Sequence, residues 1–470
     1  MSNTTIYDTR LQAHVVLEAE TPLVIGSGRK TMLTDAAILK DINGFPYIPG
    51  TSIAGILSHA LDEKTKGSFF GVKSTSKEND NDSKGSDIIF SEGKIIDLKG
   101  NVIDGISNSS DTDFSDRFKC LPKRNHVCLT DKGVAKKAGK FDEEVIYKGC
   151  RFAFDIEMVA KSGELDSASS FFDEVLSSLY SSTFRIGGGT RNGFGKMKVH
   201  GIKKRTLILS NECELEKYLN YSSNRSSNYA DWTPFKKSST DEGWITYELT
   251  LKPNDFFFFG AGFGDKYVDD IQVREECIEW NDQNEGTFKE RYLIPATSLK
   301  GAIAHRVAFY SNLKDGKYAV QIPVKEFDKY AMQIPAEEFD NYSGGMNKAV
   351  GLLFGYHKDD QRRGICIFND LFVKKTDHKE KVFNHVSIDR FTGGAIDGAL
   401  FSEKVIDGRD LELKTTIMVK DTREEGLTDA LECLERALKD IDLGTLTFGG
   451  GSGRGHGTFT CTIIKNGQTL

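Results

Sequence analysis

Alternating apolar and polar positions open each half of the chain and predict two strands of the same form. Every second residue is apolar over 11–17 and again over 245–251. Because side chains alternate between the two faces of a strand, each segment would bury one face against a core.

Apolar residues at helical spacing follow the first strand, at 53–61. Thr51 and Ser52 precede them, and Thr297 and Ser298 hold the matching place in the second half; hydroxyl residues are good helix N-caps. The order strand, helix, strands, helix, strand is that of a ferredoxin-like α+β unit. The remaining expected elements are helices near 170–182 and 425–440 and last strands at 196–202 and 458–464.

Three motifs occur twice in the same order, which indicates that the two halves are copies of one unit. The intervals are 295 − 49 = 246, 384 − 125 = 259 and 449 − 187 = 262 residues. We therefore predict a first unit at 1–220, a linker at 221–243 and a second unit at 244–470. The motifs are Pro-Gly-Thr-Ser at 49–52 and Pro-Ala-Thr-Ser at 295–298, Asn-His-Val at 125–127 and 384–386, and glycine-rich loops at 187–195 and 449–457.

Length and composition describe a globular protein of two domains. The chain has 470 residues, of which 38% are hydrophobic and 28% charged, and a single core seldom extends over such a length. No apolar run approaches the roughly 20 residues that span a bilayer. The first residues lack the basic-then-apolar form of a signal peptide. We expect a cytoplasmic protein with no membrane partner.

The net charge of −7 argues against a nonspecific nucleic-acid binder, but the basic residues are clustered. Segment 184–205 holds seven Lys or Arg and no acid, and segment 117–140 holds eight against one. Both segments carry motifs of the repeat. A binding face is therefore favoured over solvated loop charge, which is the alternative.

The glycine-rich loops favour phosphate binding, because glycine lets backbone N–H groups approach an anion closely. Each loop precedes a strand and lacks Gly-Lys-Ser/Thr, so neither a dinucleotide fingerprint nor a P-loop fits. Arg185, Arg191, Lys196 and Arg454 would add cations. The alternative is a tight turn between a helix and a strand.

Further motifs resemble those of the RAMP proteins of CRISPR systems. They are Gly-Ser-Gly at 26–28, Ile-Pro-Gly-Thr-Ser at 48–52, Phe-Phe-Gly at 69–71 with Leu-Phe-Gly at 353–355, and the segment 388–401. The chain most resembles two fused copies of the backbone subunits of type III effector complexes. The resemblance implies ferredoxin-like cores with thumb hairpins at about 128–145 and 386–405. It also implies an antiviral ribonucleoprotein with guide RNA, single-stranded target RNA and other CRISPR effector subunits as partners.

The resemblance also implies which residues lie along the RNA. They belong to the Gly-Ser-Gly turn, the starts of the two motif helices and the glycine-rich loops. Pure helix capping is the alternative for the helix starts. The expected contacts are Ser27, Gly28, Thr51, Ser52, Arg185, Gly188, Gly189, Arg191, Lys196, Thr297, Ser298, Lys300, Gly450, Gly451 and Arg454.

Asp35 follows the Gly-Ser-Gly turn, where cleaving members of the family carry the Asp that cutting of target RNA requires. A carboxylate there can hold a divalent cation, Mg²⁺ or Mn²⁺, or position the RNA 2′-OH for attack on its own phosphate. The alternative is an ordinary loop Asp. In the second unit Asp270-Ile-Gln-Val matches Asp35-Ala-Ala-Ile best, which makes Asp270 the expected second metal-binding and catalytic carboxylate, with Asp269 behind it.

Two other functions stay open. One is a structural RNA-binding subunit whose target is cut elsewhere. The other is a processor of the guide precursor, which usually uses histidine chemistry; His126, His385 and His456 lie on repeat motifs but suit stacking or hydrogen bonding better.

The eight cysteines form no Cys-x-x-Cys pair, which favours free thiols in a reducing compartment. Cys120, His126, Cys128 and Cys150 could hold zinc in principle, but their spacing is not a standard one. A short tandem echo at 321–330 and 333–342 has no functional interpretation.

Overall fold

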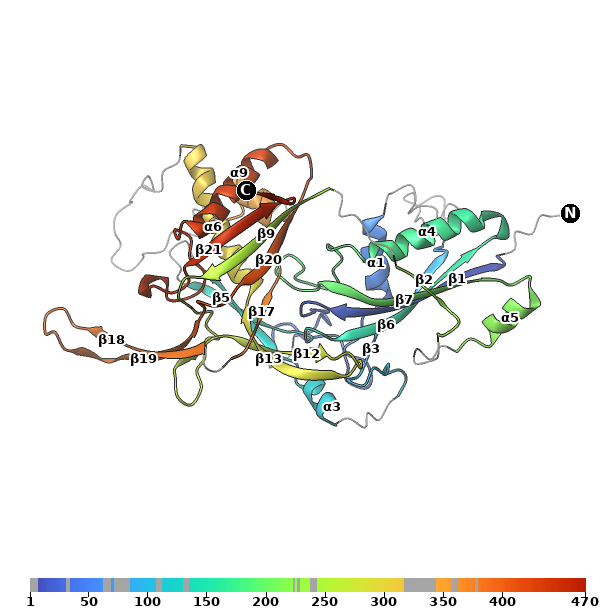
Figure 1. Ribbon diagram of the computed structural model, residues 1–470, viewed down its shortest axis with the longest axis horizontal. Coiled ribbons are helices and arrows are strands. Elements are labelled where there is room, and N and C mark those ends of the chain that lie inside the picture. The colour runs from blue at the N-terminus through green and yellow to red at the C-terminus, as the bar shows by residue number, and fades with distance from the viewer. Residues whose placement is uncertain are drawn as a thin grey trace.

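A computed structural model shows two units joined end to end along the long axis of the molecule (Figure 1). Each unit has its own antiparallel sheet and its own hydrophobic core. The structure describes residues 7–30, 34–61, 69–71, 85–106, 112–129, 135–222, 225, 229–236, 243–316, 344–356, 362–376 and 379–470. The tandem echo within 321–342 lies outside them.

The first unit confirms the expected ferredoxin-like fold. The sheet order is β2-β6-β1-β7-β8, with β1 between β6 and β7. Ile53 of α1 and Phe172 of α4 are buried against the sheet, where they join Val15 of β1 in one core. Its elements are β1 (Thr9–Ala19), α1 (Gly50–Ala60), β2 (Ile88–Phe90), β3 (Lys94–Ile95), α3 (Thr112–Lys119), β6 (Arg151–Ala160), η2 (Ser162–Glu164), α4 (Leu165–Ser178), β7 (Met197–Ile208), α5 (Glu212–Leu219) and β8 (Thr233–Pro234).

The second unit repeats this order, with β16-β20-β9-β21-β22 as its sheet. Leu299 of α6 and Leu434 of α9 pack on Leu249 of β9. Its elements are β9 (Trp244–Pro253), β10 (Phe256–Phe257), β11 (Asp270–Ile271), α6 (Ala296–Lys314), α8 (Lys348–Phe354), β14 (Gly355–Tyr356), β15 (Arg362–Arg363), β16 (Cys366–Ile367), β17 (Leu371–Lys374), β20 (Leu413–Lys420), α9 (Leu427–Asp442), η4 (Ser452–Arg454), β21 (Phe459–Lys465) and β22 (Gln468–Thr469).

Each unit also carries a long hairpin outside its sheet. In the first unit β4 (Lys123–Leu129) pairs with β5 (Ala135–Glu144), and in the second β18 (Glu380–Ile388) pairs with β19 (Ala395–Asp407). The β18–β19 hairpin projects from the body at the left of Figure 1. Both hairpins overlap the expected thumbs but begin several residues earlier.

A third hairpin, β12 (Arg274–Trp280) with β13 (Gly286–Ile294), occurs in the second unit and packs against the first. Trp280 donates its indole N–H to the carbonyl of Gly149 at 2.8 Å, and Ile278 N–H bonds to Lys148 O at 2.8 Å. This hairpin fills the segment before Ile294-Pro295, which is longer than the segment before Ile48-Pro49 in the first unit.

Part of the expected linker belongs to the first sheet, because β8 lies within 221–243 and pairs with β7. Tyr229, Trp232 and Phe235 of this segment are buried. Among the described residues, no helix is both long and apolar enough to cross a membrane.

Candidate functional site

Asp35 lies beside the base of the first hairpin. Its backbone N–H donates to Asp142 Oδ1 at 2.8 Å, and the N–H of Asp142 donates to Asp35 Oδ2 at 3.3 Å. The next residue, Ala36, pairs with Glu143 in a parallel bridge. The Asp35 side chain is 53% exposed. The hairpin therefore holds one carboxylate oxygen, and the side chain stays accessible.

Asp269 has the same surroundings in the second unit. The N–H and the Oγ–H of Ser402 donate to Asp269 Oδ2 at 2.7 and 2.9 Å, and Asp269 N–H donates to Ser402 Oγ at 3.1 Å. The next residue, Asp270, pairs in parallel with Glu403 of β19. Asp269 is exposed.

Backbone contacts around both carboxylates repeat at one constant interval. Leu39 N–H bonds to Ile25 O as Val273 N–H bonds to Phe259 O, and both intervals are 273 − 39 = 259 − 25 = 234. The same interval takes Asp35 to 269. Asp269, and not Asp270, is therefore the structural counterpart of Asp35.

The expectation that Asp270 occupies this place is corrected by the hydrogen bonding of its side chain. Asp270 Oδ1 accepts the N–H groups of Ile271 at 2.9 Å and Gly262 at 3.3 Å. Burial raises the pKa of this carboxyl. Asp270 holds the turn that precedes β11, and its carboxylate is only half exposed.

A histidine–glutamate pair braces the base of each hairpin. His126 Nε2 lies 2.8 Å from Glu143 Oε1, and His385 Nε2 lies 3.0 Å from Glu403 Oε1. The two imidazoles stack on Phe141 and Phe401, each at 4.8 Å between ring centroids. In the second unit His456 also faces Glu403, at 3.3 Å. These contacts fit the structural interpretation of the histidines.

The two glycine-rich loops fold alike. Gly188 N–H bonds to Val24 O and Gly450 N–H bonds to Phe258 O, both at 2.7 Å. Gly189 and Gly451 have φ of +62° and +74°, a region that favours glycine. A Cβ on either glycine would lie within 2.6 Å of the ring at 194 or 456.

The first loop is docked on the second unit. Gly193 pairs with Asn369, and a Cβ at Gly193 would lie 2.6 Å from Ala296 Cβ and from Asp370 Oδ1. Lys300 of α6 donates to Asn192 Oδ1 at 2.8 Å. The 190–195 part of this loop is thus an interface between units, while Gly188 and Gly189 are exposed.

Arg185 is consequently not available to RNA in this structure, which corrects its expected role. It is 4% exposed and donates to Asn369 Oδ1 at 2.5 Å and to Phe194 O at 3.3 Å. Arg191 donates to Gly364 O at 2.9 Å. Burial lowers the pKa of Arg185 and of Arg191 to about 10, and that of Lys300 to about 8.

A buried ion cluster completes this interface. Arg124 of β4 donates to Glu275 Oε2 at 2.7 Å and to Asp370 Oδ2 at 2.6 Å. Asp370 Oδ1 also accepts the N–H of Ala296, the first residue of α6, at 2.8 Å. The cluster links the first hairpin to the start of the second motif helix.

The second loop is open by comparison. Arg454 is 39% exposed and donates to Glu403 Oε2 at 2.5 Å. Gly449, Gly450, Ser452 and Gly453 are exposed. This loop and Arg454 remain candidates for RNA contact.

The starts of the motif helices differ from the expected caps. Helices α1 and α6 begin at Gly50 and Ala296, so Pro49 and Pro295 hold the N-cap positions and no side chain caps either helix. The hydroxyl residues lie in the first turn instead. Thr51 and Ser298 are exposed, and Ser52 and Thr297 are half-buried.

The remaining expected contacts lie in the first unit. Ser27 Oγ donates to Ala37 O at 3.0 Å, and Gly28 has a φ of +72°. Lys196 pairs with Glu20 at 2.8 Å. Their expected RNA contacts stay predictions.

A family model described as the RAMP superfamily matches residues 16–198 and 255–460. The two matches cover 183 + 206 = 389 of the 470 residues. The chain belongs to the RAMP superfamily. Each match falls within one of the two units, so the protein carries two RAMP domains in tandem. A search of curated proteins finds no match.

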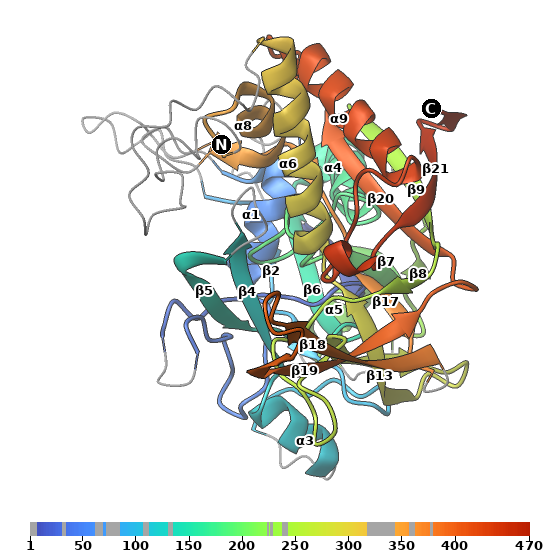
Figure 2. The same cartoon turned by 90° about the vertical axis from the view of Figure 1, so that its left-hand side faces the viewer.

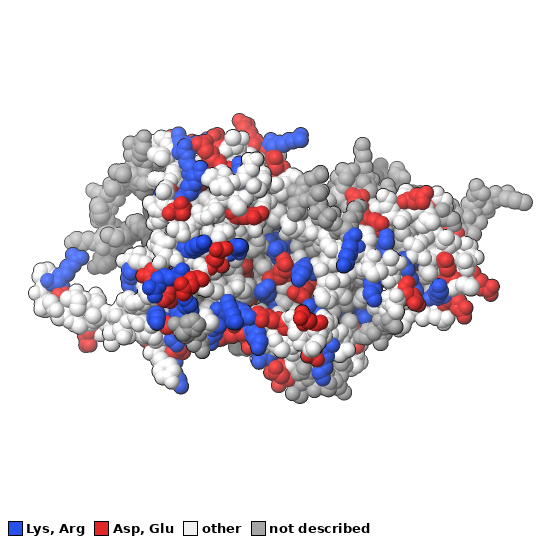
Figure 3. Space-filling model, in the orientation of Figure 1, with Lys and Arg blue, Asp and Glu red and all other residues white. Residues whose placement is uncertain are grey.

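The family makes this chain a CRISPR-associated RNA-binding protein. RAMP proteins generally bind CRISPR RNA and other CRISPR-associated subunits, and some of them are endoribonucleases. On the face of this RAMP protein in Figure 3, basic and acidic residues are interspersed. Binding there would depend on placed contacts more than on a broad positive field.

One or two carboxylates at each site could serve as ligands to a metal ion. Asp35 and Asp142 adjoin each other in the first unit, and Mg²⁺ commonly takes one or two carboxylates together with substrate phosphates. Asp269 supplies one carboxylate in the second. Within the described ranges no three His, Cys, Asp or Glu side chains gather as a metal site. Cys120, His126, Cys128 and Cys150 accordingly form no such group; Cys150 is buried, and Cys120 and Cys128 are exposed.

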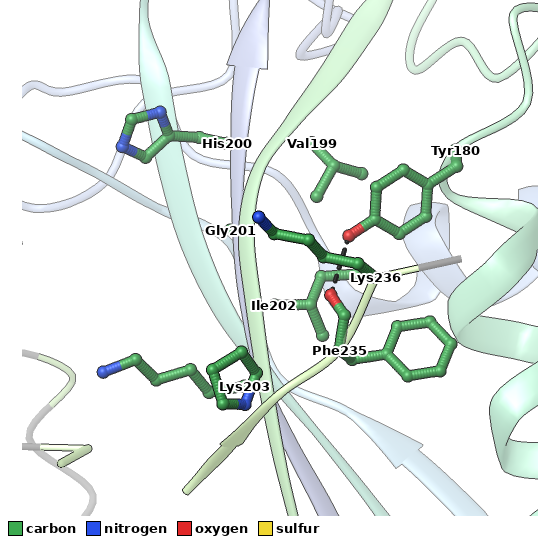
Figure 4. Close-up of a pocket in the computed structure, with 9 residues that line it drawn as sticks. Tyr180, Val199, His200, Gly201, Ile202, Lys203, Phe235 and Lys236 are labelled. Atoms are coloured by element: carbon green, nitrogen blue, oxygen red, sulfur yellow. Dashed lines mark hydrogen bonds between the residues drawn. The ribbon is translucent and has the colours of Figure 1, made fainter. Parts of the chain in front are cut away.

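An open pocket of about 520 Å³ lies on the first RAMP domain, away from these carboxylates. Figure 4 shows Tyr180, Ile202 and Phe235 around it, with the Tyr180 hydroxyl donating to Phe235 O at 2.9 Å. Its walls are mainly apolar, and nothing in its lining identifies a ligand.

Proposed function

We propose that the protein is a guide-RNA-binding backbone subunit of a type III CRISPR interference complex that also cuts the paired target RNA. One cut would be made by each RAMP domain, with Asp35 acting in the first and Asp269 in the second. The observation that carries this proposal is the matched setting of these two carboxylates. Each is accessible, and each has one oxygen bonded to the second strand of a hairpin that lies outside the sheet.

The proposed reaction is attack of a target 2′-OH on its own neighbouring phosphate. Asp35 or Asp269 would hold that hydroxyl or its phosphate in place, and the hairpin would keep the carboxylate fixed while the RNA is aligned. A divalent cation bound there would neutralise charge on the phosphate. The expected products carry a 2′,3′-cyclic phosphate and a 5′-OH.

The test is target cleavage by the assembled complex with Asp35→Ala, Asp269→Ala and Asp270→Ala introduced singly. We expect Asp35→Ala to remove one product and Asp269→Ala its neighbour, with target binding unchanged. Asp270→Ala is the matched control, because it lies one residue away and faces its own turn. A ladder that stays intact in both the Asp35 and Asp269 variants would leave a structural RNA-binding subunit.

Recognition of RNA by the protein alone should be weak and independent of sequence, because phosphates and shape supply it while base pairing reads the target. Affinity measured by filter binding should fall steeply with salt. Tight binding to one short motif, insensitive to salt, would contradict a backbone role.

A further inference from the structure

The repeated Asn-His-Val motif lies on the first strand of each hairpin, at 125–127 of β4 and 384–386 of β18. Its histidine faces inward to Glu143 or Glu403. Because neighbouring residues on a strand face opposite sides, the asparagine before it faces outward. The braced histidine explains one residue of the motif and leaves Asn125 and Asn384 unexplained.

The strand register places each asparagine in line with the candidate carboxylate, with one strand between them. Asn125 lies opposite Asp142, and Asn384 lies opposite Ser402. Asp142 and Ser402 are the residues that bond to Asp35 and Asp269. Residues opposite one another across strands share a face. Asparagine, hairpin partner and catalytic candidate therefore form one row across three chain segments in both domains.

Neither asparagine serves the fold in the part of the chain that the structure describes. Asn125 and Asn384 are both exposed, and neither carboxamide has a hydrogen-bond partner there. Asparagine is also disfavoured in strands. Adjacent positions differ between the domains, with Arg124 against Phe383 and Asp142 against Ser402. A residue kept twice beside such changes, without a structural partner, points to an external ligand.

We infer that Asn125 and Asn384 are positioning residues that bind the target ribose at the cut. A carboxamide offers two donors and one acceptor, so it can accept from the 2′-OH and donate to the adjacent phosphate oxygen. The carboxylate and the carboxamide would bind the same nucleotide from the two outer segments of this row, on either side of the second hairpin strand. The inference rests on the proposed function for its location and adds the ribose 2′-OH as the group that is recognised.

The first experiment compares cleavage by Asn125→Ala and Asn384→Ala complexes at saturating target. Each should slow its own cut by about 10- to 100-fold, because loss of alignment is costly, and leave the other cut unchanged. Val127→Ala and Val386→Ala are matched controls, since both valines are about half exposed and lie two residues further on the same outer face. Equal rates in the asparagine and valine variants would overturn the inference.

The second experiment needs binding alone. Affinity is measured for shortened targets, each with a single 2′-deoxy nucleotide across the paired segment. The intact complex should lose about 3- to 10-fold in affinity at the nucleotide that is gripped, the worth of one hydrogen bond. In the Asn125→Ala complex, the same 2′-deoxy substitution should leave the affinity unchanged.

The two experiments separate the inference from the proposed function. Normal cutting by the Asp35 and Asp269 variants would end the proposed function, while a coupling between Asn125 and one 2′-OH would still support ribose recognition. An equal 2′-deoxy loss with and without Asn125 would overturn the inference even if both Asp variants fail to cut.

Discussion

The two glycine-rich loops share one backbone fold and meet opposite environments. In the first loop residues 187–189 are exposed but 190–195 are covered by the second RAMP domain, whereas in the second loop the matching residues 452–455 are exposed. Arg185 in the first is buried, and Arg454 in the second is 39% exposed. A loop sequence can therefore specify a turn without specifying whether its cations face RNA or another part of the chain.

The residues that pack beside the two loops also differ between the domains. Arg124 and Phe383 are counterparts at the interval 383 − 124 = 259, and Phe194 and His456 at 456 − 194 = 262. The first domain has a buried arginine over an aromatic ring at 4.7 Å. The second has Phe383 beside His456 at 5.5 Å. The charged residue of this pair, Arg124, therefore lies in the interface between the domains, and its counterpart in the second domain is apolar.

Removing the buried arginine should have the largest effect. Arg124→Ala would leave Glu275 and Asp370 buried and unpaired, at a cost of about 3–5 kcal/mol. Urea unfolding followed by fluorescence measures it. Phe383→Ala serves as the counterpart, and a cost for Arg124→Ala below 1 kcal/mol would mean that water reaches the cluster.

A matched pair of glycines isolates the contact between domains. Gly193 and Gly455 are equivalent and have φ of +101° and +90°, but only Gly193 has neighbours within 4 Å of a Cβ. Gly455→Ala should cost about 1–2 kcal/mol for backbone strain alone. Gly193→Ala should cost a further 1–3 kcal/mol or so, because its Cβ would overlap Ala296 and Asp370. Equal melting temperatures for the two variants would show that the interface yields easily.

Lys300 should give this interface a dependence on pH. Burial lowers its pKa from 10.5 to about 8. Between these values the unfolded chain binds more protons than the folded protein, so stability rises with pH over that window. Lys300→Met should lack that rise and gain about 1–3 kcal/mol at pH 7. Parallel stability curves for both proteins from pH 7.5 to 9.5 would contradict the lowered pKa.

Arg454→Ala should have the smallest effect on RNA binding, and it also removes the bond that Arg454 donates to the buried Glu403. It should lower affinity modestly and reduce the slope of log affinity against log salt by about 1, as expected for one phosphate contact. Arg191→Ala should instead act on stability, because its guanidinium bonds to Gly364 O. The two variants are distinguished by titrating each protein with a single-stranded RNA at three salt concentrations and comparing the affinities.

The repeat and the ferredoxin-like order could be predicted because they depend on local patterns, such as alternation over 11–17. The register at the second carboxylate could not. Asp270-Ile-Gln-Val matches Asp35-Ala-Ala-Ile in apolar character, but the backbone ladder pairs Ala36 with Glu143 and Asp270 with Glu403. One residue of slip in a strand changes which side chain faces outward.

The burial of Arg185 was also beyond sequence reasoning. A basic residue beside glycines suits a phosphate and a buried amide equally well. What decides is Asn369 of the other domain, 184 residues further along the chain. The paired roles of Asp142 and Ser402 were missed for a similar reason, although the Asn-His-Val motif marks the strand opposite them.

The wide separation in sequence between Arg124 and its partners also affects the order of events during synthesis. Its partner Asp370 lies 246 residues later, so at about 5–20 residues per second the ribosome needs roughly 10–50 s to deliver it. Glu275, the other partner of Arg124, follows after 151 residues, so the cluster is completed in two steps. The contact between the two domains therefore forms only late in synthesis, after the whole first domain and most of the second have been made.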